Sequence, residues 1–258
     1  MARKAGEKIK VAFGAPKQIT FKADIDLVTK TDKEVEEMLM GAIRGRFPDH
    51  KFVAEENVSD GKGEEVLTEA PTWLIDPIDG TTNFVHKFPF CCVSIGLAIN
   101  KQVVVGVVYN PMLDELFTAI KGQGAKKNGT PIQVSTTDSL QQSLVATGFP
   151  YDRSYTKQVL EVLQKVVEKV RDVRRAGSAA LDMCYVASGV FEAYYENGIH
   201  AWDVAAGSLI LLEAGGVVSG FALDKELDIC KRQIVATNAG IAKELRLIVK
   251  DLESIYRV

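Results

Sequence analysis

The sequence is poor in cysteine and has no long apolar run, and each shortage excludes a class of protein. Its four cysteines, Cys91, Cys92, Cys184 and Cys230, include no CxxC pair, so they suit neither a zinc site nor the disulfide framework of a small secreted domain. We expect them to be reduced and mostly buried. No apolar stretch approaches the ~20 residues that span a bilayer, and the N-terminal MARKAGEKIKVAF alternates charged and apolar residues, unlike a signal peptide. A cytoplasmic protein is therefore expected.

The sequence also lacks a large excess of either charge. Its formal net charge is −3, and basic clusters such as KVRDVRR are short and mixed with acids, so neither nucleic acid nor a membrane is an expected partner. Internal repeats, linkers and the strand-GxGxxG-helix unit of a dinucleotide-binding module are missing too. What remains is 258 residues, 47% of them hydrophobic, which suits one large domain or two closely packed ones. The expected partners are small molecules or a second copy of the chain.

The order of the predicted elements indicates a layered α/β protein. TKTDKEVEEMLMGAIRGRF has a capping box, Thr31 with Glu34, followed by apolar residues at helical spacing. Short β-rich runs such as KFVAEE, TWLID, FCCVSIGLAI, QVVVGVVYNP and ELFTAI follow, as expected of a sheet with hairpins. The second half alternates strand and helix signals, which favours a sheet covered by helices. We therefore divide the chain into halves at residues 1–145 and 146–258 that form one compact unit.

The segment TWLIDPIDGTTNF, residues 72–84, carries more acid than a turn requires. Pro77 restrains the backbone around Asp76, and Gly80 permits a sharp exit, so Asp76 and Asp79 are both held just past a buried strand. Two carboxylates so close together are stable as anions only if a cation lies between them or one binds a proton. The backbone N–H groups of Gly80 and Thr81 can in addition hold an anion.

Two further acids are candidates to join this pair. FVAEEN places Glu55 and Glu56 at the end of a strand-like run, and AWDVAAG places Asp203 at the head of a helix that is apolar nearly all round. If Glu55 and Asp203 converge with the two aspartates, the ligands are all oxygen atoms, which favours a hard cation such as Mg²⁺ over zinc. Because such cations activate water and neutralise a leaving alkoxide, the composition favours hydrolysis of a phosphate monoester.

Each of these residues also has an ordinary structural explanation. Taken singly, Asp76 and Asp79 are common turn formers, Asp203 suits a helix N-cap, and Glu55 suits an exposed surface. GQGAKKNG lacks the Lys-Ser/Thr ending of a phosphate loop and is typical of a hairpin turn. Convergence of the acids in the fold would distinguish a functional site from these alternatives.

The segments WLIDPIDGTTNFVHKFPF and WDVAAGSLILLEAGG closely resemble the two motifs of the inositol monophosphatase family. DLVTKTD, FVAEEN, GVVYNPMLDELFTAIKGQGAKKNG and AYYENGIHAWD are similar to that family in the order it requires, so the resemblance covers nearly the whole chain. It implies an alternating αβαβα sandwich, a homodimer, and a Mg²⁺-dependent, lithium-sensitive inositol monophosphatase that hydrolyses inositol phosphate monoesters. It leaves open a relative that acts on another sugar or polyol phosphate, such as a dual inositol monophosphatase and fructose-1,6-bisphosphatase, and a non-catalytic metal or phosphate sensor.

The same resemblance implies the ligands of two or three Mg²⁺ ions per subunit. Glu55, Asp76 and the carbonyl of Ile78 would bind one ion. Asp76, Asp79 and Asp203 would bind a second, and Glu55 would also help to hold a loosely bound third.

The resemblance also assigns catalytic groups. Thr81, hydrogen-bonded towards Asp32, would position and activate the attacking water together with Glu55. The amides of Gly80 and Thr81 would bind the phosphate.

For the polyol, the resemblance points to Glu196, to Asp79 and to the backbone around Gly177 and Ala179. Lys22 aligns with the lysine of the family's active-site loop only when a one-residue gap is allowed. The segment SGFALDKELDICKRQ is shorter than the family usually shows, which indicates an altered outer loop.

Overall fold

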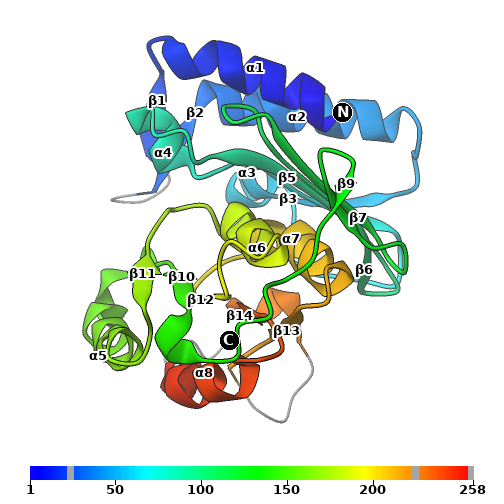
Figure 1. Cartoon of the computed structure of the whole chain (residues 1–258). Coiled ribbons are helices and arrows are strands. Elements are labelled where there is room, and N and C mark those ends of the chain that lie inside the picture. The colour runs from blue at the N-terminus through cyan, green and yellow to red at the C-terminus, as the bar shows by residue number, and fades with distance from the viewer. Residues whose placement is uncertain (22–25, 222–226, 255–258) are drawn as a thin grey trace.

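The structure is a computed structural model in which residues 1–21, 26–221 and 227–254 are described. These residues form stacked layers in the order helix, sheet, helix, sheet, helix, seen from top to bottom in Figure 1. The αβαβα sandwich expected from the sequence is therefore confirmed. Lys22 lies outside the described residues.

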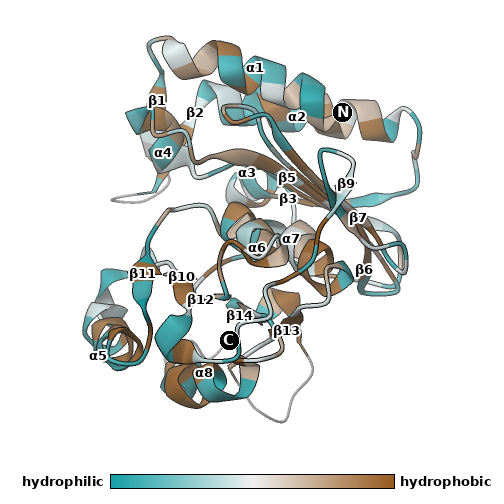
Figure 2. Ribbon diagram, viewed as in Figure 1, coloured by the Kyte–Doolittle hydropathy of each residue, from teal (hydrophilic) through white to brown (hydrophobic). Residues whose placement is uncertain are grey.

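The first layer consists of two helices, α1 (Ala2–Gly14) and α2 (Lys30–Arg44). They are connected through the short antiparallel pair β1 (Ile19–Phe21) and β2 (Leu27–Thr29). Both helices pack one apolar face against the first sheet, and hydrophilic and hydrophobic residues alternate along them in Figure 2. The apolar spacing along α2 predicted this arrangement.

The start of α2 differs from the prediction. The capping box is formed by Thr29 and Asp32, two residues before the predicted pair of Thr31 and Glu34. The backbone N–H of Thr29 donates to Asp32 Oδ2 (3.0 Å), and its hydroxyl donates to the same oxygen. Both pairs satisfy the sequence pattern, and the earlier one prevails because β2 ends at Thr29.

The first sheet has seven strands in the described part of the chain, in the order β3-β4-β5-β6-β7-β8-β9. Strands β3 and β4 are parallel, and the later neighbours are antiparallel. The C-terminal ends of β3 and β4 therefore meet at one edge, where the short helices α3 and α4 begin. The bounds are β3 (Lys51–Ala54), α3 (Glu55–Ser59), β4 (Thr72–Asp79), α4 (Thr81–His86), β5 (Cys92–Ile99), β6 (Gln102–Asn110), β7 (Glu115–Ile120), β8 (Ala125–Lys127) and β9 (Thr130–Pro131).

The middle layer, α6 (Ala179–Ala187) and α7 (Ala201–Glu213), is buried between the two sheets (Figure 1). Helix α7 approaches the first sheet at the cross-strand pair Gly96 and Gly106. A Cβ at Gly96 would lie 3.0 Å from the Cβ of Ala205, and one at Gly106 would lie 2.6 Å from the carbonyl oxygen of Ala206. Glycine at both positions therefore lets the helix backbone contact the sheet directly.

The second sheet and the last helix layer come from the C-terminal half. The order of strands is β11-β10-β12-β14-β13, with β10 parallel to β11 and β12 and with β14 antiparallel to its neighbours. Helices α5 and α8 cover its outer face (Figure 1). The predicted division after residue 145 falls inside β10 and stays a prediction. The bounds are η1 (Leu140–Gln142), β10 (Leu144–Thr147), η2 (Arg153–Tyr155), α5 (Thr156–Val167), β11 (Asp172–Arg174), β12 (Ala193–Asn197), β13 (Val217–Ser219), η3 (Ile229–Lys231), β14 (Gln233–Thr237), α8 (Ala242–Val249) and η4 (Lys250–Ser254).

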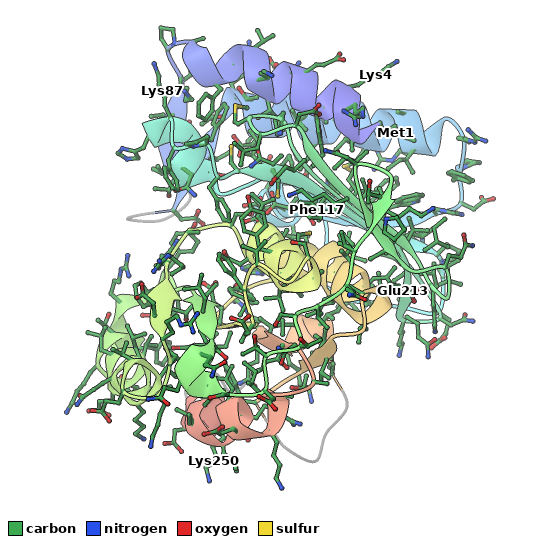
Figure 3. All side chains as sticks on the ribbon, viewed as in Figure 1. Met1, Lys4, Lys87, Phe117, Glu213 and Lys250 are labelled. Atoms are coloured by element: carbon green, nitrogen blue, oxygen red, sulfur yellow. The ribbon has the colours of Figure 1, made fainter. Side chains whose placement is uncertain are left out.

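Apolar side chains fill the spaces between the layers. Phe117 of β7, labelled in Figure 3, is fully buried between the first sheet and the middle helices. Cys91, Cys92 and Cys184 are buried free thiols and Cys230 is a half-buried one, as the sequence predicted. Among the helices that the structure describes, none combines the length and the apolar character needed to cross a membrane.

Candidate active site

The two aspartates of DPIDGTT lie on an irregular end of β4. The sequence predicted a turn after Asp76, but β4 continues to Asp79. The pairing of β4 with β5 jumps from Asp76 opposite Ser94 to Asp79 opposite Cys92, so three steps on β4 face two on β5. Residues three apart on a regular strand point to opposite faces. The bulge removes that alternation, and both carboxylates line the same pocket.

The chain leaves β4 through Gly80, which lies against the second glycine-containing motif of the site. Gly80 has a φ of +91°, and a Cβ there would lie 3.0 Å from the Phe90 carbonyl oxygen and 3.1 Å from that of Gly177. The side chain of Asn83, in α4, donates to the carbonyl oxygens of Phe90 (2.7 Å) and Ala176 (2.8 Å). The DGTT and AGSAA segments are thus fastened together by backbone contacts.

Asp79 is oriented by the start of α6. Its Oδ2 accepts hydrogen bonds from the hydroxyl of Ser178 (2.6 Å) and from the N–H of Ala180 (2.7 Å). The N–H of Ala179 also favours the ionised form. The start of α6 therefore fixes the orientation of the Asp79 carboxylate in the pocket.

Glu55 begins α3 at the edge where β3 and β4 end. The helix is held by Glu36 of α2, whose carboxylate accepts the N–H of Glu56 and the N–H of Asn57, both at 2.8 Å. Glu55 lines the pocket, whereas its buried neighbour Glu56 does not. Of the two acids that FVAEEN offers, Glu55 is thus the one that can act in the pocket.

Asp203 lies in the first turn of α7, behind the N-cap residue His200. The N–H of His200 donates to Asp203 Oδ2 (2.7 Å), which completes a capping box. The imidazole of His200 is held between Glu65 and Arg232, with contacts of 2.7 Å on each side. The N-cap role proposed for Asp203 thus belongs to His200, and Asp203 faces the pocket as well.

One pocket of about 360 Å³ collects these side chains at the junction of the first sheet, the middle helices and the second sheet. Asp32 lies behind it and contacts it through Thr81, whose hydroxyl is 3.1 Å from Asp32 Oδ1 and 3.0 Å from the Ile78 carbonyl oxygen. The other candidate residues all line the pocket: Glu55, Asp76, Ile78, Asp79, Gly80, Thr81, Gly177, Ala179, Glu196 and Asp203. The fold brings together residues that are far apart in the sequence.

The aspartates concentrate negative charge in the pocket, and the arginines that line it, Arg153 and Arg175, form no salt bridge with Asp76, Asp79 or Asp203 among the described residues. Burial, and then the neighbouring carboxylates, raise the pKa of Asp76 and of Asp203 well above the usual range. Burial also raises the pKa of Asp79 to about 6, although the donors of α6 oppose this shift. Among the described residues, Asp76, Asp79 and Asp203 form no salt bridge with a lysine, arginine or histidine side chain.

A hard cation fits this donor set. The candidate ligand groups are carboxylates, which favour a hard cation, and the imidazole of His200, which also lines the pocket, is held by Glu65 and Arg232. Within the described residues, no three His, Cys, Asp or Glu side chains are grouped closely enough to hold a metal ion as they stand. The carboxylates instead line the walls of the pocket, where a bound cation would relieve their mutual repulsion.

Glu196 lies at the end of the pocket formed by β12 and β10. The hydroxyl of Tyr194 donates to Glu196 Oε2, and the backbone of Gly148 lies directly against the carboxylate. Burial raises the pKa of Glu196 to about 7. Gly177 and Ala179 lie on the same pocket wall, as the resemblance implied.

Several residues that shape this site were not found from the sequence. Ser178 and Glu36 orient Asp79 and Glu55, Asn83 fastens the two motifs, and Gly148 contacts Glu196. Ser178 had a visible signal, because it precedes an apolar helix as an N-cap would. The other contacts join elements that no local pattern connects.

Comparison with known proteins agrees with this geometry. The sequence model of the inositol monophosphatase family matches residues 1–256. "Inositol monophosphatase 2" of Solanum lycopersicum is 49% identical over 93% of this chain and 91% of its own length. "Inositol monophosphatase 1" of Homo sapiens is 42% identical over 96% of this chain and 92% of its own. The solved structure of inositol monophosphatase from Anabaena superimposes with a TM-score of 0.83 at 40% identity, covering 96% of this chain and 91% of that one.

Proposed function

This chain belongs to the inositol monophosphatase family of phosphatases, and we propose that it hydrolyses inositol phosphate monoesters to myo-inositol and phosphate in a Mg²⁺-dependent reaction. The observation that carries this proposal is the convergence in one pocket of four carboxylates with the Thr81–Asp32 pair. A turn former, an N-cap and a surface acid would have no reason to meet there.

Metal binding in this proposal uses the acidic end of the pocket. Glu55, Asp76 and the Ile78 carbonyl would hold one Mg²⁺, and Asp76, Asp79 and Asp203 a second. Bound Mg²⁺ would neutralise charge on the phosphate and its leaving oxygen and lower the pKa of a water molecule. By resemblance to the family, we expect lithium to inhibit the reaction.

The Thr81–Asp32 pair would orient the attacking water. With its proton donated to Asp32 Oδ1 (3.1 Å) or to the Ile78 carbonyl oxygen (3.0 Å), the Thr81 hydroxyl presents its lone pairs to the pocket. It can therefore accept a hydrogen bond from the water, while Glu55, which lines the same pocket, would take up the proton that the water loses. The N–H groups of Gly80 and Thr81 would hold the phosphate oxygens at the start of α4.

Glu196 would bind the polyol. Tyr194 occupies Glu196 Oε2, so Oε1 is free to accept a hydroxyl group of the substrate. The phosphate would then bind near DGTT and the ring near β12, within one cavity.

A second candidate is hydrolysis of a sugar bisphosphate such as fructose 1,6-bisphosphate. Arg153 and Arg175 line the same pocket, and Arg175 forms no ion pair among the described residues. An exposed guanidinium at the mouth of an acidic cavity suits a second phosphate group. Arg175→Ala would then impair hydrolysis of the bisphosphate more than hydrolysis of inositol 1-phosphate.

A substrate panel tests both candidates. Released phosphate is measured for inositol 1-phosphate, fructose 1,6-bisphosphate and glycerol 2-phosphate, each with Mg²⁺ and with a chelator. The proposal expects turnover only with Mg²⁺ and the highest kcat/KM for inositol 1-phosphate. A protein that binds phosphate and Mg²⁺ but releases phosphate from no ester would be a sensor instead. Sedimentation analysis of the same preparation tests the homodimer that we propose by resemblance.

A further inference from the structure

Asp182 is a buried carboxylate in the same cavity that none of the roles above uses. It lies in the first turn of α6, is 1% exposed and contributes to the lining of the pocket. Its Oδ1 has no hydrogen-bond partner among the described residues. A buried oxygen without a partner destabilises a protein by about 1–3 kcal/mol, so its presence calls for a reason.

Helix capping does not supply that reason. The N-cap of α6 is Ser178, whose hydroxyl accepts the N–H of Leu181 at 3.3 Å. The N–H of Asp182 itself donates to the Ser178 carbonyl oxygen at 2.9 Å. An acid in the first turn gains a little from the helix dipole, but an exposed position would give the same gain without the cost of burial.

The surroundings of Asp182 are those of the polyol end of the pocket. The charges that act on it are the carboxylates of Glu196 and Asp79, which with burial raise its pKa well above the usual range, and the guanidinium of Arg175, which opposes them. Tyr194, the hydrogen-bond partner of Glu196, is also within the electrostatic range of Asp182. Asp182, Glu196 and Asp79 all line this one cavity.

We propose that Asp182 is a second residue that recognises the substrate's hydroxyl groups, and that its Oδ1 accepts a hydrogen bond from a ring hydroxyl that Glu196 does not contact. A polyol ring carries several neighbouring hydroxyl donors, so two acceptors on different elements can select it over an ester with fewer hydroxyls. The inference rests on the proposed function, because it names a further contact in the same substrate complex.

The test separates recognition from structural support. Asp182→Leu keeps the branched shape and the number of side-chain heavy atoms and removes the unpartnered oxygen, and the pocket beside it offers room for the larger methyl groups, so the variant should melt at the same temperature as the wild type or higher. Its kcat/KM for inositol 1-phosphate should fall about tenfold, chiefly through KM, while that for glycerol 2-phosphate changes less than about twofold. Asp182→Asn keeps an acceptor oxygen, so its kcat/KM for inositol 1-phosphate should fall by only about threefold, again with a smaller change for glycerol 2-phosphate.

Ser219→Ala provides a matched control. Ser219 in β13 is also buried with an unpartnered oxygen, but it does not line the pocket. This variant should keep wild-type kinetics on both esters.

Equal losses on the two esters, or no loss on either, would overturn the inference. If Asp182→Leu fails to fold, the contrast measured with Asp182→Asn decides. A wild-type protein that hydrolyses neither ester would refute the proposed function, whereas an active wild type without the contrast refutes only the role of Asp182.

Discussion

Replacing Gly148 by alanine should remove substrate recognition by Glu196 without touching Glu196 itself. A Cβ at Gly148 would lie 1.9 Å from Glu196 Oε2, 2.0 Å from Cδ and 2.1 Å from Oε1. To restore an ordinary contact of 3.4 Å, the carboxylate must retreat by roughly 1.5 Å. Gly148 is not in the left-handed region, so alanine itself imposes no backbone strain.

The expected loss follows from the hydrogen bonds that this retreat breaks. A substrate hydroxyl bound to a carboxylate contributes about 1.5–3 kcal/mol, which corresponds to about a tenfold to hundredfold change in kcat/KM. Gly148→Ala should therefore lose at least tenfold for inositol 1-phosphate, and much less for glycerol 2-phosphate, which offers fewer hydroxyls. Steady-state phosphate release on the two esters measures this contrast.

A double-mutant cycle shows whether the effect passes through Glu196. Glu196→Ala removes the atoms that the new methyl group would strike, so adding Gly148→Ala to it should cost less than about twofold. Additive losses, or wild-type kinetics in Gly148→Ala, would refute the reasoning. Gly41→Ala, in the middle of α2 with no atom within 4 Å of the added Cβ, is the matched control and should leave the kinetics unchanged.

Three further predictions concern the acids of the pocket. Asp76→Asn should fold but lose turnover, because an amide brings no charge to the metal site. A folded variant that keeps more than about a tenth of the wild-type kcat, which corresponds to a barrier change below roughly 1.4 kcal/mol, would contradict the two-metal assignment. In the presence of a chelator, stability should fall as the pH rises from about 4.5 to about 7, because folded Glu196 keeps a proton there that the unfolded chain releases. Glu196→Gln should reduce this decrease in the free energy of unfolding by at most roughly 3 kcal/mol, as measured by urea unfolding at pH 5 and pH 8. A variant with the same pH dependence of stability as the wild type would contradict the prediction. Glu36→Gln leaves one N–H of α3 without its acceptor, which should disturb the position of Glu55. Activation should then require a higher Mg²⁺ concentration. An unchanged activation curve would show that Glu36 does not position Glu55.

Local patterns in the sequence predicted the elements well and their ends less well. The apolar spacing of α2 and the apolar run of α7 were sufficient to place both helices, because burial of a continuous face dominates their stability. The predicted start of α2 was wrong by two residues. Two overlapping capping boxes satisfy the same sequence pattern, and which of them forms depends on where β2 ends. The bulge between Asp76 and Asp79 was missed because it depends on the pairing register with β5.

The candidate site was predictable where its functional side chains lie close together in one short segment of the sequence. Asp76 and Asp79 were visible because two carboxylates on one short segment are electrostatically unfavourable without a purpose. Glu36 and Asp182 were invisible, since each looks like an ordinary helix residue until a distant element is placed beside it. The contact that gives Glu36 its role spans 20 residues, to the N–H of Glu56.

The arrangement of the fold explains how such a cluster of acids is tolerated. Asp76 and Asp79 come from the first sheet and Asp203 from α7, so their repulsion acts to separate these two layers. The layers are held together by close packing, because Gly96 and Gly106 admit the backbone of α7 at Ala205 and Ala206. Close packing of this kind does not depend on the ionic state of the pocket. The repulsion is therefore retained in the folded protein as free energy that cation binding can release.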